Sequence, residues 1–331
     1  DLHSFPTRRS SDLRTLFFLS FSFLVPEASI SAIESNIFEK NKDTLIDGPY
    51  NDNDKVSIIV ELKTDPLLSQ PKLKAYSSTE EYLQSNSAQK EQLSIAEAEK
   101  KVERQINQKD IDIKIKKKYS AVISGFSAEI SYGDIEEIRK IKGVKNVFVG
   151  EKYKLIEPKL SDSVSTIGGS TVQETGYTGK GTAVAILDTG LDMNHEAFKG
   201  SVNNPRYEKS DIAESIKNNR LTIGKLSADV VYHSSKIPYA FDYAGNDYNV
   251  SGGPSHGTHV AGITGANSGD KIKGVAPDAQ FFIMKVFRDS QGGASDEDIL
   301  AALDDSIKLE CDIINRSEEH TSELQSHELI S

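Results

Sequence analysis

Asp188 combines a chemically useful side chain with a position at the end of a regular element. It directly follows the apolar run TAVAIL (Thr182–Leu187), and Thr189 and Gly190 turn the chain there. Its carboxylate is therefore expected at the carboxyl end of a buried parallel strand, where catalytic and ligand-binding groups gather in open α/β sheets. The pattern predicts a functional carboxylate, and an aspartate that only caps the turn is the alternative.

A second candidate, His256, opens the segment HGTHVAGITGA, which is rich in glycine and alanine. Such small residues let a helix lie directly against a sheet, so His256 should begin a helix beside the sheet edge. A carboxylate that orients an imidazole, and an imidazole that takes a proton from a hydroxyl, are two members of a nucleophilic triad. Asp188 and His256 are therefore the candidate catalytic residues, and we expect their side chains to meet.

Metal binding is the competing chemistry for the histidines. His256 and His259 are three residues apart without a third ligand pattern, and His195 beside Glu196 has no partner histidine at metal spacing. The single cysteine, Cys311, excludes an intramolecular disulfide and a Cys-based zinc cluster. We expect no metal site, His259 directed elsewhere, His195 in a surface loop and Cys311 as a small buried residue.

Three further motifs match known chemistry less well. GPSHG (Gly253–Gly257) fits the G-x-S-x-G pattern, which would make Ser255 a nucleophile, but that elbow needs a strand running straight into it and Gly252–Pro254 predict a loop. In TGYTGKGT, Gly181 stands where a phosphate loop needs Ser or Thr. The basic run Lys114–Lys118 is typical of a solvated strand end.

Composition restricts the class of protein. A chain of 331 residues is long enough for about two domains of roughly 150 residues each. The apolar share of 37%, together with 23 glycines, argues against a disordered or fibrous chain. Because 50 acidic residues outweigh 39 basic ones, a net charge of −11 disfavours nucleic acid as a partner.

Two units of opposite charge supply the elements around these residues. Lys55–Leu155 holds 19 basic and 15 acidic residues, a net of +4, and Ile156–Asn315 holds 14 and 22, a net of −8. The units should therefore attract each other. The first is predicted as βαββαβ, a ferredoxin-like α+β fold. Its elements are expected at Val56–Leu62, Thr79–Gln108, Ile111–Lys117, Ala121–Ile130, Gly133–Ile141 and Val144–Lys152.

The second unit is predicted as a doubly wound α/β domain with a parallel sheet, of which this chain holds only a part. Thr182–Leu187 and Phe281–Phe287 are continuous apolar runs, as in strands buried on both faces. Ser295 is the predicted N-cap of a helix, with Asp298 completing a capping box. Its buried stripe is Ile299, Leu300, Leu303 and Ile307, and a last strand begins at Asp312–Ile314.

The ends of the chain are expected to lie outside these domains. Residues 4–13 and 316–326 resemble translated sequencing adapters, so 1–13 and 316–331 are set apart as adapter-like. Residues 14–32 hold a short apolar run before small residues, a partial signal-peptide pattern that predicts export. Residues 33–54 and 156–176 are expected to be linkers, the second a protease-sensitive boundary.

The segments VAILDTGLD around Asp188 and SHGTHVAGI around His256, in this order, resemble the subtilisin-like serine peptidases of the S8 family. IKGVAPDAQFFIMKVF and CDIIN further along the chain also match. Residues 55–155 resemble the I9-type inhibitory propeptide, and 177–315 the N-terminal part of the S8 catalytic domain. The HEAF segment and the long insert before His256 are closest to the Gram-positive cell-envelope branch, the lactocepin and C5a-peptidase type.

This resemblance implies roles for individual residues. Asp188 would be the triad acid and His256 the general base, while Gly292 and Gly293 would lie on the segment that pairs with extended substrate. Relatives often carry a calcium-binding Asp shortly after the catalytic one. Ala197 occupies the matching position, so no calcium site is identified, although calcium binding by the full-length protein stays open.

The resemblance supplies no nucleophile within this chain. The family's serine, in a Gly-Thr-Ser-Met-like helix start, and its oxyanion Asn are expected beyond Asn315. Ser295 is a predicted cap, Ser306 is mid-helix and Ser317 lies in the adapter-like tail, so none replaces it. We therefore expect this fragment to be inactive as it stands.

The resemblance as a whole predicts an exported serine endopeptidase made as a zymogen, secreted or cell-wall associated. Its partners would be polypeptide substrates and its own propeptide as intramolecular inhibitor, with no cofactor and no membrane span in the mature part. The alternative is a propeptide-type protease inhibitor or binding module joined to a catalytically dead second domain. Mixing residues 55–155 with an intact homologous protease would distinguish the two.

Overall fold

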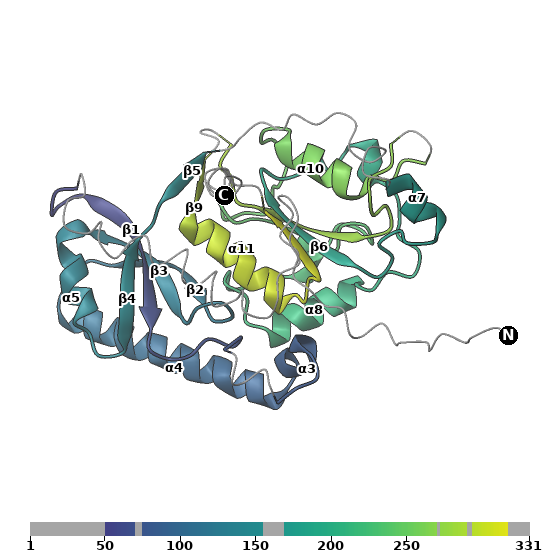
Figure 1. Cartoon of the computed structure of the whole chain (residues 1–331). Coiled ribbons are helices and arrows are strands. Elements are labelled where there is room, and N and C mark those ends of the chain that lie inside the picture. Colours follow the sequence, from purple (N-terminus) through teal and green to yellow (C-terminus); the bar gives the residue numbers. More distant parts are fainter. Residues whose placement is uncertain (1–49, 70–74, 155–168, 270–271, 290–292, 317–331) are drawn as a thin grey trace, which may run out of the picture.

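The computed structural model describes residues 50–69, 75–154, 169–269, 272–289 and 293–316, and shows two units packed against each other (Figure 1). The predicted signal peptide, the whole N-terminal adapter-like segment and Gly292 lie outside the described residues, as do parts of both linkers and of the C-terminal tail. None of the described helices is long and apolar enough to cross a membrane.

The first unit, residues 50–69 and 75–154, is called the prodomain after the resemblance noted above, and it has the predicted ferredoxin-like topology. Its four antiparallel strands lie in the order β2-β3-β1-β4, and α4 runs along the sheet (Figure 1). The elements are β1 (Lys55–Leu62), α3 (Thr79–Leu83), α4 (Asn86–Gln108), β2 (Lys114–Tyr119), β3 (Gly125–Ser131), η1 (Tyr132–Asp134), α5 (Ile135–Arg139) and β4 (Val144–Val149).

Several boundaries in the prodomain differ from the sequence prediction: the strand expected at Ile111–Lys117 is Lys114–Tyr119, and the helix expected at Gly133–Ile141 is Ile135–Arg139. The single helix expected over Thr79–Gln108 is two helices, because the hydroxyl of Ser85 accepts a hydrogen bond from the Ala88 amide at 3.2 Å and starts α4 anew. The strand expected from Ala121 begins only at Gly125. The last predicted strand ends at Val149, and the chain then forms β5 (Lys152–Lys154) away from the prodomain sheet.

The second unit has the predicted parallel sheet, with strand order β10-β6-β8-β7. Its elements are α7 (Gly169–Glu174), β6 (Ala183–Asp188), η2 (Glu196–Phe198), α8 (Lys209–Asn218), α9 (Ala228–Val231), β7 (Tyr239–Asp242), α10 (His256–Gly265), β8 (Gln280–Lys285), β9 (Gly293–Ser295), α11 (Asp296–Lys308) and β10 (Ile313–Arg316). Residues 169–174, expected in the linker, form α7, and Arg316, assigned to the adapter-like tail, ends β10.

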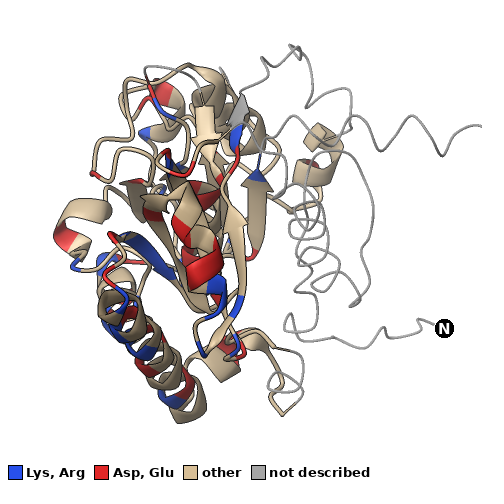
Figure 2. Cartoon of the chain, turned by 90° about the vertical axis from the view of Figure 1, so that its left-hand side faces the viewer, with Lys and Arg blue, Asp and Glu red and all other residues tan. Residues whose placement is uncertain are grey.

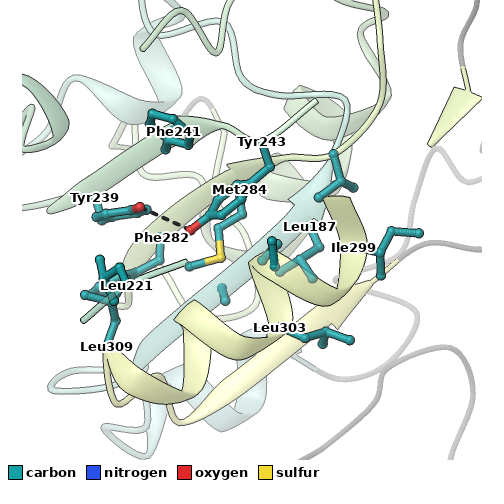
Figure 3. Close-up of a cluster of buried hydrophobic side chains, with 14 of the residues drawn as sticks. Leu187, Leu221, Tyr239, Phe241, Tyr243, Phe282, Met284, Ile299, Leu303 and Leu309 are labelled. Carbon is teal, nitrogen blue, oxygen red and sulfur yellow. Dashed lines mark hydrogen bonds between the residues drawn. The ribbon is translucent and has the colours of Figure 1, made fainter. Parts of the chain in front are cut away.

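Alternating side chains of β6 and β8 build two layers of core, which explains why both strands are continuous apolar runs. Val184, Ile186 and Phe281 pack with Ala261 of α10 on one face. The residues on the other face join α11 in a second cluster (Figure 3), which includes Leu187, Phe282, Met284, Ile299 and Leu303. The helix that carries His256 and the helix that meets the prodomain therefore cover opposite faces of one sheet.

Helix α11 is buried on almost every side because it lies between the two sheets. Ile59, Tyr119 and Ile123 of the prodomain belong to the same apolar cluster as the predicted stripe of α11. The predicted capping box is wrong: Ser295 occupies the N-cap position, but its hydroxyl donates to Asp298 Oδ2 at 2.6 Å instead of accepting from the backbone. The first amide of α11, that of Asp296, donates instead to the carbonyl of Glu151 at 3.3 Å.

The carboxylate of Asp304, fully buried on α11, is held by backbone amides of the prodomain. The amides of Ala121 and Val122 donate to Oδ1 at 2.6 and 3.0 Å, and that of Ser120 donates to both carboxylate oxygens at 3.2–3.3 Å. Lys308, one turn further along α11, lies 2.6 Å from Oδ2. The loop expected to be strand is thus an anion-binding turn that fixes the prodomain on α11.

Acidic residues of α11 also face basic residues of β2, shown in red and blue in Figure 2. Lys117 is buried and pairs with Asp298, and its ammonium donates to the Tyr243 carbonyl at 2.8 Å. Lys116 lies 3.2 Å from Glu297. The expectation of a solvated basic run is therefore wrong for Lys117, and the predicted attraction between the units is localised here.

Replacing Asp304 with alanine is expected to destabilise the chain by about 3–5 kcal/mol, because the buried Lys308 and three buried amides lose their common partner. Urea unfolding of the whole chain measures the effect. Asp229→Ala is the matched control, since Asp229 forms an exposed ion pair with Lys209 and should cost less than about 1 kcal/mol. Equal losses in the two variants would contradict an anchoring role for Asp304.

Glu310, which follows α11, makes stability depend on pH. Burial, together with the nearby carboxylate of Glu80 of the prodomain, raises the pKa of Glu310 to about 7. Because its pKa is higher in the folded than in the unfolded chain, its stabilising contribution is complete below about pH 4.5 and is lost as pH rises to about 7.

The expected loss over this pH range is on the order of 2 kcal/mol for the native chain relative to Glu310→Gln. Thermal unfolding midpoints of both proteins, measured between pH 4.5 and 7.5, test this. Parallel pH profiles of the two proteins would show that Glu310 carries no raised pKa.

Candidate active site

Asp188 and His256 lie in direct contact at the carboxyl end of the sheet. Asp188 ends β6 and His256 begins α10, and both side chains are buried. The Nδ1 atom of His256 is 2.7 Å from Oδ1 and 2.9 Å from Oδ2 of Asp188. An ionised carboxylate can accept hydrogen bonds but has no proton to donate. This geometry therefore favours the imidazole tautomer with its proton on Nδ1.

Thr189 ties the end of the strand to the start of the helix. Its amide donates to Asp188 Oδ1 at 2.7 Å, which helps to fix the orientation of the carboxylate. Its hydroxyl donates to the carbonyl of Pro254 at 2.7 Å and accepts from the amide of Gly257 at 2.9 Å. The two candidate residues are therefore positioned by one shared neighbour.

Gly190 and Gly257 allow the two segments to approach this closely. A Cβ atom on Gly257 would lie 2.3 Å from the carbonyl oxygen of Gly190 and 3.1 Å from Asp188 Oδ1. Gly190 has a φ of +103°, and a Cβ there would lie 2.0 Å from the carbonyl oxygen of Val250. A larger residue at 257 would push α10 away from the turn after β6, and one at 190 would collide with the chain at Val250, before the helix.

The other histidines do not join the site. His259 is exposed on α10. The Nδ1 of His195 accepts from the Ala197 amide at 3.2 Å, which caps the short helix η2. Ala197 itself is buried and offers no side-chain oxygen, so this position does not fit the calcium ligand of the relatives. Among the described residues, no three His, Cys, Asp or Glu side chains gather as a metal site.

Within the described ranges, His256 Nε2 has no hydrogen-bond partner, although Nδ1 has two. Ser255 is exposed and follows a loop instead of a strand, so the G-x-S-x-G interpretation is wrong. The hydroxyl of Ser306 donates to the Ala302 carbonyl at 2.6 Å within α11. Neither serine is placed to exchange a proton with the imidazole.

Gly293 lies on a strand edge that is already paired. Its strand β9 runs antiparallel to β5, with Lys154 opposite Gly293 and Lys152 opposite Ser295. Gly292 lies outside the described residues. The sequence did not predict β5, because its three residues follow β4 without a turn residue other than Gly150. The edge expected to bind substrate is thus bound by the last strand before the linker.

The two units of this fold match two different families in sequence comparison. Residues 179–326 match the subtilase family, and residues 58–155 match the peptidase inhibitor I9 family. The chain therefore carries an I9 domain followed by a domain of the subtilase family, as the resemblance of its motifs predicted.

Three relatives show the range of similar proteins. The PII-type proteinase of Lacticaseibacillus paracasei is 31% identical over 79% of this chain and 14% of its own length. The minor extracellular protease Vpr of Bacillus subtilis is 28% identical over 62% of this chain and 24% of its length. The C5a peptidase of Streptococcus pyogenes serotype M3 is 32% identical over 44% of this chain and 13% of its length. The chain thus spans less than a quarter of each relative.

Substituting Gly257 by alanine should break the contact between Asp188 and His256, because the new Cβ would overlap the Gly190 carbonyl. The low-field resonance of the His256 Nδ1 proton, followed by NMR, is expected to disappear. Gly262→Ala on the same helix is the control: its Cβ would meet no atom within 4 Å, and it should stabilise the chain by about 0.5–1 kcal/mol. An unchanged resonance in Gly257→Ala would contradict the role of close packing.

Proposed function

We propose that this chain supplies the acid and the base of an exported serine endopeptidase that is made as a zymogen. The observation that carries the proposal is the buried hydrogen bond from His256 Nδ1 to the Asp188 carboxylate at 2.7 Å. It lies at the strand end where open α/β sheets hold their catalytic groups. Membership of the subtilase family and the proteinase relatives support the same activity.

In this mechanism, Asp188 keeps the proton of the imidazole on Nδ1 and stabilises the imidazolium that forms during reaction. The Nε2 atom then takes the proton of a serine hydroxyl as that oxygen attacks the scissile carbonyl, and later returns it to the leaving amine. We propose that the serine and the oxyanion donor lie outside this chain. Without them, this chain hydrolyses no peptide bond at a useful rate.

The prodomain is proposed to inhibit by occupying the strand edge that extended substrate would use. Peptide recognition by strand addition relies on main-chain hydrogen bonds, so any extended segment with free backbone groups can bind there. The antiparallel pairing of β5 with β9 fits this role, and Gly293 at its end lacks a side chain that would obstruct a peptide. Cleavage in the linker after β5 would free the edge for polypeptide substrates.

Export to the cell surface or medium is part of the proposal. It is supported by the apolar run of residues 16–25 and by a relative described as extracellular. The prodomain, docked through ion pairs and buried carboxylates, would keep the enzyme inactive until it reaches the cell surface or the medium.

Recovery and expression of the complete reading frame tests the proposed function. We expect a serine in a Gly-Thr-Ser setting within the catalytic domain, and peptide-bond hydrolysis that begins only after the linker is cut. Replacing that serine by alanine should lower kcat by about 10⁶ without preventing prodomain docking.

An open reading frame without such a serine would contradict the peptidase assignment and favour the alternative, a protease inhibitor with an inactive second domain. Residues 55–155 should then inhibit an intact homologous protease slowly and tightly, with the isolated segment first checked for folding by circular dichroism.

A further inference from the structure

Lys285 is a buried lysine next to the candidate active site with no role in the mechanism described above. It is the last residue of β8, opposite Asp188 of β6 on one side and Asp242 of β7 on the other. Three charged residues thus end three neighbouring strands at the same level. The side chain of Lys285 is 2% exposed, so its charge needs partners within the protein.

Two carboxylates, one at the end of β7 and one in the segment after β8, satisfy this ammonium. Lys285 Nζ lies 2.8 Å from Asp242 Oδ2 and 2.7 Å from Asp289 Oδ1. Burial opposes the charge, but the hydrogen bonds to both carboxylates outweigh it and raise the pKa of Lys285 above its usual value. Lys285 is therefore a permanent cation that links the end of β7 to the segment following β8.

The aliphatic stem of Lys285 packs against the segments that carry the catalytic pair. A Cβ on Gly190, two residues after Asp188, would lie 3.0 Å from Lys285 Cδ. A Cβ on Gly253, three residues before His256, would lie 3.6 Å from Lys285 Cε and 2.9 Å from Asp289 Oδ1. The stem therefore supports the turn after the acid and the loop before the base at once.

Asp289 connects this network to the strand edge bound by β5. The two residues before Asp289 pair with β9: the amide of Arg288 donates to the carbonyl of Gly293 at 3.0 Å, and Phe287 forms an antiparallel β-bridge with Ala294. The ion pair from Lys285 thus ties Asp289, the neighbour of Arg288, to the same sheet that carries Asp188.

We propose that Lys285, which bridges Asp242 and Asp289, is a positioning residue. It fixes the position of the Asp188–His256 pair relative to the strand edge that binds extended peptide. The aliphatic stem contacts the turn after Asp188 and the loop before His256. The ammonium holds Asp289 to the end of β7. The meaning of this role rests on the proposed function, but the geometry it predicts can be measured in this chain alone.

The test is the exchange rate of the His256 Nδ1 proton with water, measured by NMR on the full 331-residue chain with ¹⁵N-labelled histidine. Lys285→Met keeps the stem and removes the charge, so exchange is expected to accelerate about tenfold or more as Asp289 separates from the end of β7. Asp289→Asn, at a half-exposed position that tolerates change, should accelerate it several-fold.

Lys236→Met is the matched control, because Lys236 is equally buried in the same domain but donates only to the carbonyls of Pro277 and Ala279. It should leave the exchange rate of the His256 proton within about twofold of the native value. Circular dichroism establishes whether each variant is folded. If Lys285→Met does not fold, the exchange rate in Asp289→Asn tests the proposal.

A native exchange rate in folded Lys285→Met, or in Asp289→Asn when the first variant does not fold, would overturn the proposal. Equal acceleration in Lys236→Met would also overturn it, because the effect would then be general destabilisation. A full-length protein without peptidase activity would contradict the proposed function but would leave these exchange rates and their interpretation unchanged.

Discussion

The buried contact between a carboxylate and an imidazole governs how the second unit is built. Asp188 and His256 are separated by 67 residues in sequence, and their contact requires a strand to end where a helix from a later segment begins. Glycine at positions 190 and 257, and one threonine that bonds to both segments, make that approach sterically feasible. The parallel sheet and the helix on its face are the scaffold that holds these few atoms in place.

The same sheet carries the prodomain on its opposite side. Helix α11 places its apolar stripe on the sheet and its carboxylates against the prodomain, so one element belongs to both cores. The prodomain also extends β5 to the edge at Gly293. A single docking arrangement centred on α11 thus gives the two units a shared apolar cluster and covers the strand edge at β9.

Long apolar runs and small-residue patterns were sufficient to predict the positions that matter most. The continuous apolar sequences of β6 and β8 indicated a buried parallel sheet, and the glycines and alanines after His256 indicated a helix packed closely on it. Because these patterns reflect burial on both faces of the sheet, they can be recognised without knowing which elements pack against it. The ferredoxin-like order of the prodomain followed from alternation of strand and helix signals in the same way.

Features that depend on contacts between the units could not be predicted in this way. Lys117 lies in a run typical of solvated strands, and only the presence of Asp298 across the interface explains its burial. The loop at residues 120–124 has the composition of a strand, but its amides face a buried carboxylate of the other unit. The short strands β5 and β7 have too few residues for a periodic pattern, and pairing with distant strands creates them.

Kinetics of the full-length protein test the central claim, that Asp188 and His256 act together as the acid and base of a peptidase. Peptide hydrolysis would be measured for the native enzyme, Asp188→Asn, His256→Ala and the double variant. We expect kcat to fall by about 10⁴ or more in each single variant, with KM little changed, and the double variant to be hardly slower than His256→Ala. Near-native kcat in either single variant, or fully additive losses, would contradict it.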